Sequence, residues 1–153
     1  DHEDFDNMGC FWVPRDPGKA GQSLEYRYRM YWNADEPNPP QNLARPTRTG
    51  IGRGGFPYTR ANPPEIKRFA IEFTGGTLAS FSKDKKPEAV ITPSRGEISS
   101  IFLETTSWND AWRLQFDIKA EGTDPVDIRA YLRDGETALT ETWLFKLHPQ
   151  KTW

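Results

Sequence analysis

Apolar and polar residues alternate with a period of two in several segments of this sequence, and this alternation constrains the fold more than any other feature. Residues 112–118 (WRLQFDI) place four apolar side chains on one side: Trp112, Leu114, Phe116 and Ile118. Successive side chains of a β-strand point to opposite faces, whereas a helix would scatter this pattern around its surface. The same alternation predicts strands at residues 23–32, 68–73, 126–132 and 140–147, and turn residues delimit further predicted strands at residues 9–13, 77–81, 88–92 and 97–104.

Turn-forming residues separate these segments. Thirteen prolines and twelve glycines are spread over 153 residues, and the pairs Gly75-Gly76 and Asp134-Gly135 stand between predicted strands. Short strands with turn signals between them are typical of an antiparallel β-sandwich. We therefore expect one all-β domain, an immunoglobulin-like sandwich of about seven to eight strands. Its core should include Phe69, Phe73, Trp112, Phe116, Ile128 and Trp143.

The segment 33–65 lacks this alternation and contains seven of the thirteen prolines, so one long loop rich in proline and glycine is expected there. Its residues Gly50 to Gly55 fit the G-x-G-x-x-G pattern of dinucleotide-binding sites. That motif ends a strand and starts a helix, whose N-terminal amides bind the pyrophosphate. The prolines that follow, at positions 57, 63 and 64, exclude such a helix. No nucleotide or other cofactor is expected.

The same segment is basic, which allows two interpretations. Its arginines can be a solvated surface, because runs of charge usually face water. Alternatively, Arg48 and Arg53 can donate to carboxylates or sugar hydroxyls of a partner surface, since the guanidinium group is a fork-shaped donor. Gly52 and Gly54 would let the backbone approach that surface closely. We expect residues 45–60 to contact a partner at these four positions.

Catalytic patterns are weak. The two histidines, at positions 2 and 148, have no metal-ligand spacing, and no G-x-S-x-G nucleophile motif occurs, so neither a metal site nor a catalytic residue is predicted. Charged residues are rarely buried, so solvent-facing positions are expected for the strand and turn carboxylates, namely Glu72, Glu104, Asp117, Asp127, Glu136 and Glu141. Trp112 alternates with core residues. Trp108 lies in a predicted turn and Trp32 borders the long loop, so these two are the candidates for stacking on a sugar ring.

Charge and hydropathy exclude two classes of partner. The net charge is −2, from 20 basic and 22 acidic residues, which gives no field that would attract nucleic acid. No apolar run approaches the roughly 20 residues of a membrane-spanning helix, so membrane insertion is not expected. The single cysteine, Cys10, cannot form an internal disulfide.

Six segments follow one another along the chain: DNMGCFWVP, GQSLEYRYRMYW, TRTGIGRGG, KRFAIEFTGG, AWRLQFDI and LTETWLFKLHP. In this order and spacing, over residues 5–149, they resemble the C-terminal domain of the glucans biosynthesis protein G/D family. The resemblance implies a periplasmic protein of Gram-negative bacteria that is needed for osmoregulated β-1,2-linked glucans.

Members of that family join a large N-terminal β-sandwich domain to a smaller immunoglobulin-like C-terminal domain. The resemblance therefore implies a connecting strand at residues 1–14, from a missing N-terminal domain, and the C-terminal domain at residues 15–153. The family's catalytic carboxylates belong to the N-terminal domain, so none is carried over to a residue here. Some relatives hydrolyse β-1,2-glucan, which implies enzymatic activity for the full-length parent and not for this domain alone.

Three functions stay open. We expect an accessory domain whose partner is the parent's N-terminal domain near its glucan cleft, with β-glucan as a candidate ligand. A free-standing carbohydrate-binding module would need an exposed aromatic platform, for which Trp32 and Trp108 are the candidates. A structural or interaction domain without a ligand is the third possibility.

Overall fold

A computed structural model describes residues 13–34, 36, 39–55, 65–81 and 85–149. The chain separates into two units, Asp1–Pro37 and Asn38–Trp153. The strands of the described residues all belong to the second unit. The two units are considered separately below.

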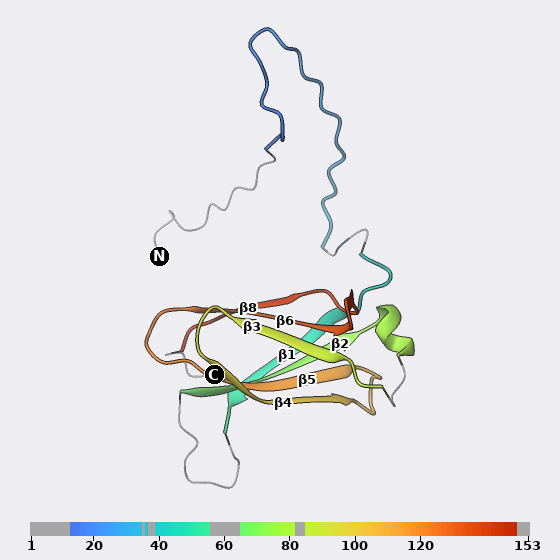
Figure 1. The fold of residues 1–153 in the computed structure, drawn as a ribbon. Helices are drawn as coiled ribbons and strands as arrows, with labels where there is room; N and C mark the ends of the chain where they lie inside the picture. The colour runs from blue at the N-terminus through green and yellow to red at the C-terminus, as the bar shows by residue number, and fades with distance from the viewer. Residues whose placement is uncertain (1–12, 35, 37–38, 56–64, 82–84, 150–153) are drawn as a thin grey trace. The chain divides into compact units, whose positions relative to one another are not determined.

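The second unit is a sandwich of two antiparallel four-stranded sheets, which Figure 1 shows as two layers. The first sheet has the order β1-β2-β5-β4, formed by β1 (Arg45–Arg53), β2 (Ile66–Thr74), β5 (Trp112–Lys119) and β4 (Glu97–Thr105). In the second sheet, β6 (Val126–Asp134) pairs with β3 (Glu88–Pro93), β7 (Thr137–Ala138) and β8 (Trp143–Leu147). The described residues contain no α-helix. The predicted all-β sandwich is confirmed.

Aromatic side chains from both sheets fill the core. Phe69 stacks on Phe116 at a ring-centroid distance of 5.3 Å, and the indole of Trp143 meets the Phe69 ring edge-on at 5.4 Å. The Trp143 Nε1–H donates to Thr49 Oγ1 at 2.9 Å, so the polar edge of this indole has a partner. Burial of the predicted core set, Phe69, Phe73, Trp112, Phe116, Ile128 and Trp143, is confirmed.

Residues 77–81 were expected to form a strand, and this prediction is wrong. Residues Gly76–Ser80 form a short 3₁₀-helix that buries Leu78. Gly76 has φ 54°, and a Cβ atom there would lie 2.4 Å from the carbonyl carbon of Leu43. Only glycine fits this close approach of two backbone segments. The Gly75-Gly76 pair therefore starts a helical turn and not a hairpin.

Part of the expected long loop is a strand. Strand β1 covers Arg45–Arg53 and pairs with β2 along its length, with a register irregularity between Pro46 and Arg48. Proline and glycine inside a segment argue against a central strand, but both are tolerated on edge strands and at irregularities. Strand β1 lies at the edge of its sheet. The G-x-G-x-x-G run thus lies in and just after an edge strand that pairs back on β2. Residues 56–64 of the expected loop lie outside the described residues.

The segment 23–32, which has the cleanest alternation in the sequence, is not a strand in the first unit. Its apolar row is exposed, with exposed fractions from 46% to 88%: Leu24, Tyr26, Tyr28, Met30 and Trp32. Alternation fixes which side a strand could bury, but a strand also needs a neighbour for its backbone hydrogen bonds. Among the described residues of this unit, none forms such a neighbour. Most of the predicted strand 9–13 lies outside the described residues.

Candidate functional site on the outer face of the first sheet

The outer face of the β1-β2-β5-β4 sheet carries a row of alternating charges. Arg48 lies opposite Glu72, Glu72 opposite Arg113, and Arg113 opposite Glu104. Directly opposed residues of antiparallel strands point to the same face, so the four side chains form one line across the sheet. Each carboxylate in this line stands beside at least one cation.

Glu72 is the centre of this row and is buried. Its Oε1 accepts hydrogen bonds from Arg113, at 2.7 Å from Nη2 and 3.3 Å from Nε, and its Oε2 accepts one from Asn109 Nδ2 at 3.2 Å. The hydrogen bonds from Arg113 lower the pKa of Glu72. Burial opposes this effect, while Asn109 and the charges of Arg113 and Arg48 add to it. Glu72 is therefore an ionised anchor and not a proton donor at neutral pH.

The anchor fixes the β4–β5 loop and its tryptophan. Arg113 places its Cζ atom 4.5 Å from the ring centroid of Trp108, which is a cation–π contact. Within the loop, Thr106 N–H donates to the carbonyl of Ala111 at 2.8 Å, and Ala111 N–H donates to Thr106 Oγ1 at 3.1 Å. Trp108 remains 61% exposed. Its predicted exposure in a turn is confirmed, and the loop that carries it is held at both ends.

Uncharged residues form the next row of this face. Gly50 lies opposite Ala70, Ala70 opposite Gln115, and Gln115 opposite Phe102. The Gln115 Nε2–H donates to Glu104 Oε1 at 3.2 Å, which links this row to the charged row. Phe102 is 51% exposed at the β4 end. This row therefore has small residues on β1 and β2 and an exposed aromatic ring on β4.

A second ion pair on this face lies at the end of β1. The buried carboxylate of Asp117 accepts two hydrogen bonds from Arg68, Nε to Oδ1 at 2.7 Å and Nη2 to Oδ2 at 2.8 Å. The Gly55 N–H also donates to Asp117 Oδ2 at 3.1 Å, and Arg68 Nη2 donates to the Gly55 carbonyl at 3.0 Å. Burial acts to raise the pKa of Asp117, but the hydrogen bonds from Arg68 and Gly55 and the charge of Arg68 outweigh it, and the pKa lies below its usual range.

This ion pair explains two of the glycines. A Cβ atom at Gly54 would lie 2.5 Å from Ile66 Cγ2 and 2.9 Å from Asp117 Oδ1, and Gly55 has φ 89°. Side chains do not fit at the first position, and L-residues rarely adopt the backbone angle of the second. The glycines thus let the chain pack over the Asp117 carboxylate.

The structure corrects the expectation for the strand carboxylates. Asp127 and Glu136 are exposed as expected, but Glu72 and Asp117 are buried, so the expectation of solvent-facing positions is wrong for these two. Both occupy outward positions of their strands, and their arginine and loop partners cover them. The ion pairs depend on cross-strand register, which the alternation pattern does not specify.

The predicted site residues lie in different places. Arg48 and Gly52 lie on the outer face of β1, and Trp108 reaches the same charged row through Arg113. Arg53 is exposed at the end of β1, and Gly54 is buried beside Asp117. Trp32 is exposed in the first unit and is described apart from the sandwich. Arg48 and Trp108 are thus associated with the same charged row, Arg48 on β1 and Trp108 beside Arg113 of β5. Sequence reasoning missed Gln115, Glu104 and Phe102, which lie on the β4 and β5 strands near Arg113.

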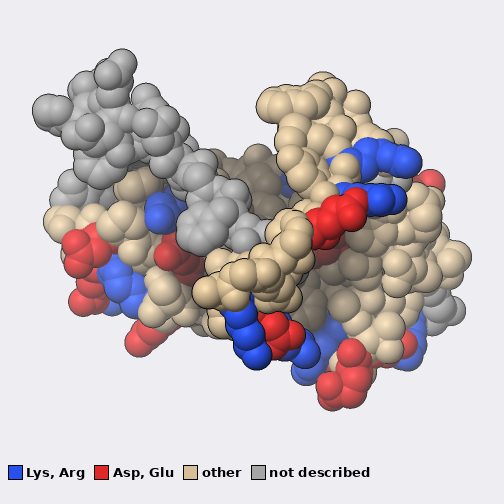
Figure 2. All heavy atoms as spheres, turned by 90° about the horizontal axis from the view of Figure 1, so that it is seen from above, with Lys and Arg blue, Asp and Glu red and all other residues tan. Residues whose placement is uncertain are grey.

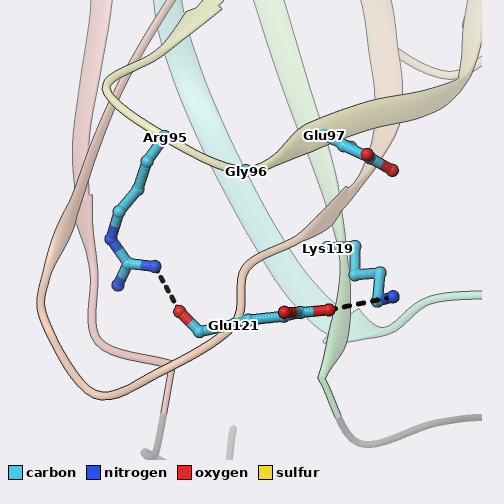
Figure 3. A pocket seen from close by; sticks show the side chains of 5 residues that line it. All are labelled: Arg95, Gly96, Glu97, Lys119 and Glu121. Carbon is cyan, nitrogen blue, oxygen red and sulfur yellow. Dashed lines mark hydrogen bonds and ion pairs between the residues drawn. The ribbon is translucent and has the colours of Figure 1, made fainter.

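A hollow of about 340 Å³ lies elsewhere on the sandwich, lined by Arg95, Gly96, Glu97, Lys119 and Glu121 (Figure 3). Arg95 donates from its two terminal nitrogens to the main-chain carbonyls of Glu121 and Asp124. Lys119 Nζ and Glu121 Oε1 form an ion pair at 3.2 Å. The Arg95 hydrogen bonds attach the β5–β6 loop to the β3–β4 turn, which is a structural role.

The face shown in Figure 2 carries Lys and Arg among Asp and Glu, without a patch of one sign. This mixture agrees with the small net charge of −2. No helix of the described residues is long and apolar enough to cross a membrane.

Comparison with known proteins identifies the family. A family model described as "Periplasmic glucan biosynthesis protein, MdoG" matches residues 1–147. The chain belongs to this periplasmic family. Glucans biosynthesis protein D 2 of Ralstonia nicotianae is 43% identical over 151 residues, which cover 97% of this chain and 28% of the relative. The chain therefore spans under a third of the length of that relative. The predicted family and its periplasmic location are confirmed.

Proposed function

We propose that this chain is an accessory, non-catalytic part of a periplasmic glucan biosynthesis protein, and that it packs against a larger region such as the one its relative possesses. The observation that carries the proposal is the exposed apolar row of residues 23–32. Extended apolar surface that is open to water is typical of interaction sites. The chain covers 28% of the Ralstonia relative, so a protein of that length has ample chain to cover this row.

The mode of packing follows from the alternation. One side of residues 23–32 carries five apolar residues, and the other carries charged residues such as Glu25 and Arg27. A segment of this kind can add to the edge of another sheet, where its backbone groups gain hydrogen-bond partners and its apolar side is buried. We propose that residues 23–32 form a strand in the sheet of the larger region. The sandwich of the second unit would then be attached to that region.

The ionised state of the outer-face carboxylates supports a non-catalytic role for the sandwich. A general acid in glycoside hydrolysis needs a raised pKa. The pKa values of Glu72 and Asp117 are instead lowered by their arginine partners, Arg113 and Arg68. These two carboxylates are suited to fixing loops, so we assign glucan chemistry to the larger region.

Amide hydrogen exchange tests the packing. The backbone amides of residues 23–32 should exchange rapidly in the 153-residue chain and be strongly protected in a family protein of the relative's length that contains this chain. Tyr28→Ser should reduce the protection, because Tyr28 lies on the apolar side. Arg27→Ser on the polar side is the matched control and should leave it unchanged. Equally rapid exchange of this segment in both proteins would rule out the strand and the packing based on it.

A further inference from the structure

We propose that the outer face of the β1-β2-β5-β4 sheet binds a neutral glucan chain on its β4 side, with Trp108 as the stacking platform and Phe102 as a second apolar contact. The choice of glucan as ligand rests on the proposed function. The site itself rests on the geometry of Trp108, Arg113, Glu104 and Gln115.

The first argument is that Trp108 is exposed and yet fixed. Arg113 covers one face of the indole, so the 61% exposure of this residue falls on the rest of the ring. Arg113 is itself held by the buried Glu72 at 2.7 Å. The loop is also attached to Glu72 through Asn109 at 3.2 Å. An aromatic platform held in this way loses little conformational entropy when a ligand stacks on it.

The second argument is the set of polar groups beside the platform. Glu104 Oε1 accepts from Gln115 Nε2 at 3.2 Å and lies 3.7 Å from Arg113 Nη1. Among the described residues, both contacts use Oε1, which leaves Oε2 of this half-buried carboxylate for a hydroxyl donor. Gln115 and Arg113 supply fixed amide and guanidinium groups in the adjacent rows. A small number of polar groups, held in fixed positions beside an aromatic surface, is typical of small-molecule sites.

The third argument selects a neutral ligand. The charges of this face alternate along the row Arg48, Glu72, Arg113 and Glu104, and Arg68 is paired with Asp117. The three cations and three carboxylates of these rows balance, and Lys86, with its Nζ 5.8 Å from the Phe102 ring centroid, adds a single positive charge at the β4 edge. Such a face has no strong net charge to attract a polyanion or a polycation. A chain of sugar hydroxyls matches it, because a hydroxyl both donates to carboxylates and accepts from guanidinium and amide groups.

The fourth argument is that the two aromatic groups are associated with neighbouring rows of the face. Phe102 and Glu104 are two residues apart on β4 and belong to neighbouring rows of this face. Neighbouring rows are about 7 Å apart along a strand. Trp108 stacks on the arginine of the Glu104 row, and Phe102 belongs to the neighbouring row, where it lies opposite Gln115. This arrangement favours an extended chain of several sugar units over a single sugar.

Isothermal titration of the 153-residue chain tests the proposal, with linear gluco-oligosaccharides of β-1,2, β-1,3 and α-1,4 linkage and with the polyanion polygalacturonate as a charge control. At least one neutral gluco-oligosaccharide should bind, and polygalacturonate should not. Trp108→Ala should weaken binding roughly tenfold or more, as expected when a central aromatic contact is truncated. Trp108→Phe should retain part of the affinity. Trp32→Ala removes another exposed tryptophan and should have no effect, and melting curves of all variants check the fold.

Two outcomes would overturn the proposal. One is that none of the neutral oligosaccharides binds to the wild-type chain. The other is that the affinity is the same in Trp108→Ala and wild type. Neither result bears on the packing of residues 23–32, because hydrogen exchange of that segment is measured without glucan. The site and the proposed packing can therefore fail separately.

Discussion

Replacing Arg68 by alanine should destabilise the sandwich strongly, because it leaves the Asp117 carboxylate buried without its cation. The change removes both hydrogen bonds of 2.7 and 2.8 Å to a side chain that is only 2% exposed. Breaking a buried ion pair on one side costs about 3–5 kcal/mol. Arg68 is 35% exposed, so water can enter the space that it leaves. We therefore expect the free energy of unfolding to fall by an amount near the lower end of this range, about 3 kcal/mol.

Chemical denaturation at pH 7 and pH 4 is the assay. In the wild type the pKa of Asp117 is lowered, so its stabilising contribution is complete above the unfolded-state pKa and is lost as the pH falls through the folded-state value. Without Arg68, burial still acts to raise this pKa and only the hydrogen bonds from Gly55 and Ser100 oppose it, so the pKa should be higher than in the wild type. The variant should then lose less stability than the wild type as the pH falls. The difference in free energy of unfolding between wild type and Arg68→Ala should therefore be smaller at pH 4 than at pH 7.

The matched control is Arg133→Ala, which removes an arginine from an exposed pair with Glu88 at 2.9 Å. Exposed pairs contribute about 0–1 kcal/mol, so this change should be nearly neutral at both pH values. Two results would refute the role assigned to the buried pair. One is a loss of stability in Arg68→Ala that is as small as in the control, and the other is a loss that is equal at pH 4 and pH 7.

Two further changes test the packing. Gly54→Ala should cost about 1–3 kcal/mol by overpacking, since its Cβ would lie 2.9 Å from Asp117 Oδ1, whereas Gly52→Ala, with no atom within 4 Å, should differ little from wild type. Equal urea midpoints for the two alanine variants would contradict the close approach at Gly54. Phe116→Ala should cost about 3–5 kcal/mol, because this ring is fully buried against Phe69, and an unchanged melting temperature would show that the ring is not in the core.

The sequence predicted the strands whose alternation coincides with a buried face. In β2, β5 and β6 the residues of one parity enter the core, as at Phe69, Phe116 and Ile128. The hydrophobic effect acts directly on this pattern, so a strand with a half-buried surface can be recognised without knowledge of its neighbours.

The failures have a common cause, which is the dependence of strands on their neighbours. Strand β1 has little alternation, and it forms because β2 offers an edge for residues 45–53. Residues 23–32 have strong alternation, and they are not a strand in the first unit. Local pattern measures the gain from burying side chains, whereas a strand also needs backbone hydrogen bonds with a second segment.

Prediction of the candidate site from sequence was limited in the same way, because its contacts also depend on neighbouring strands. The exposure of Trp108 could be predicted from its turn, but Glu72 and Asp117 were expected in solvent, because they occupy outward positions of alternating strands. They are buried by partners from other strands and loops, Arg113 in one case and Arg68 in the other. Which arginine lies opposite which carboxylate depends on register, and a shift by one residue would move each side chain to the other face.

The ion pairs also determine which groups this face can offer to a ligand. Each buried carboxylate attaches a loop to the sheet: Glu72 holds the β4–β5 loop through Asn109, and Asp117 holds the end of β1 through the Gly55 amide. The charges used in this way are neutralised by their partners and contribute little to long-range attraction. The groups that remain exposed on this face include Arg48 and the Trp108 and Phe102 rings, with half-buried polar groups beside the rings. The ion pairs of Glu72 and Asp117 therefore fix the loops around this face, and the glucan chain that we propose as its ligand would be bound by stacking and hydrogen bonding.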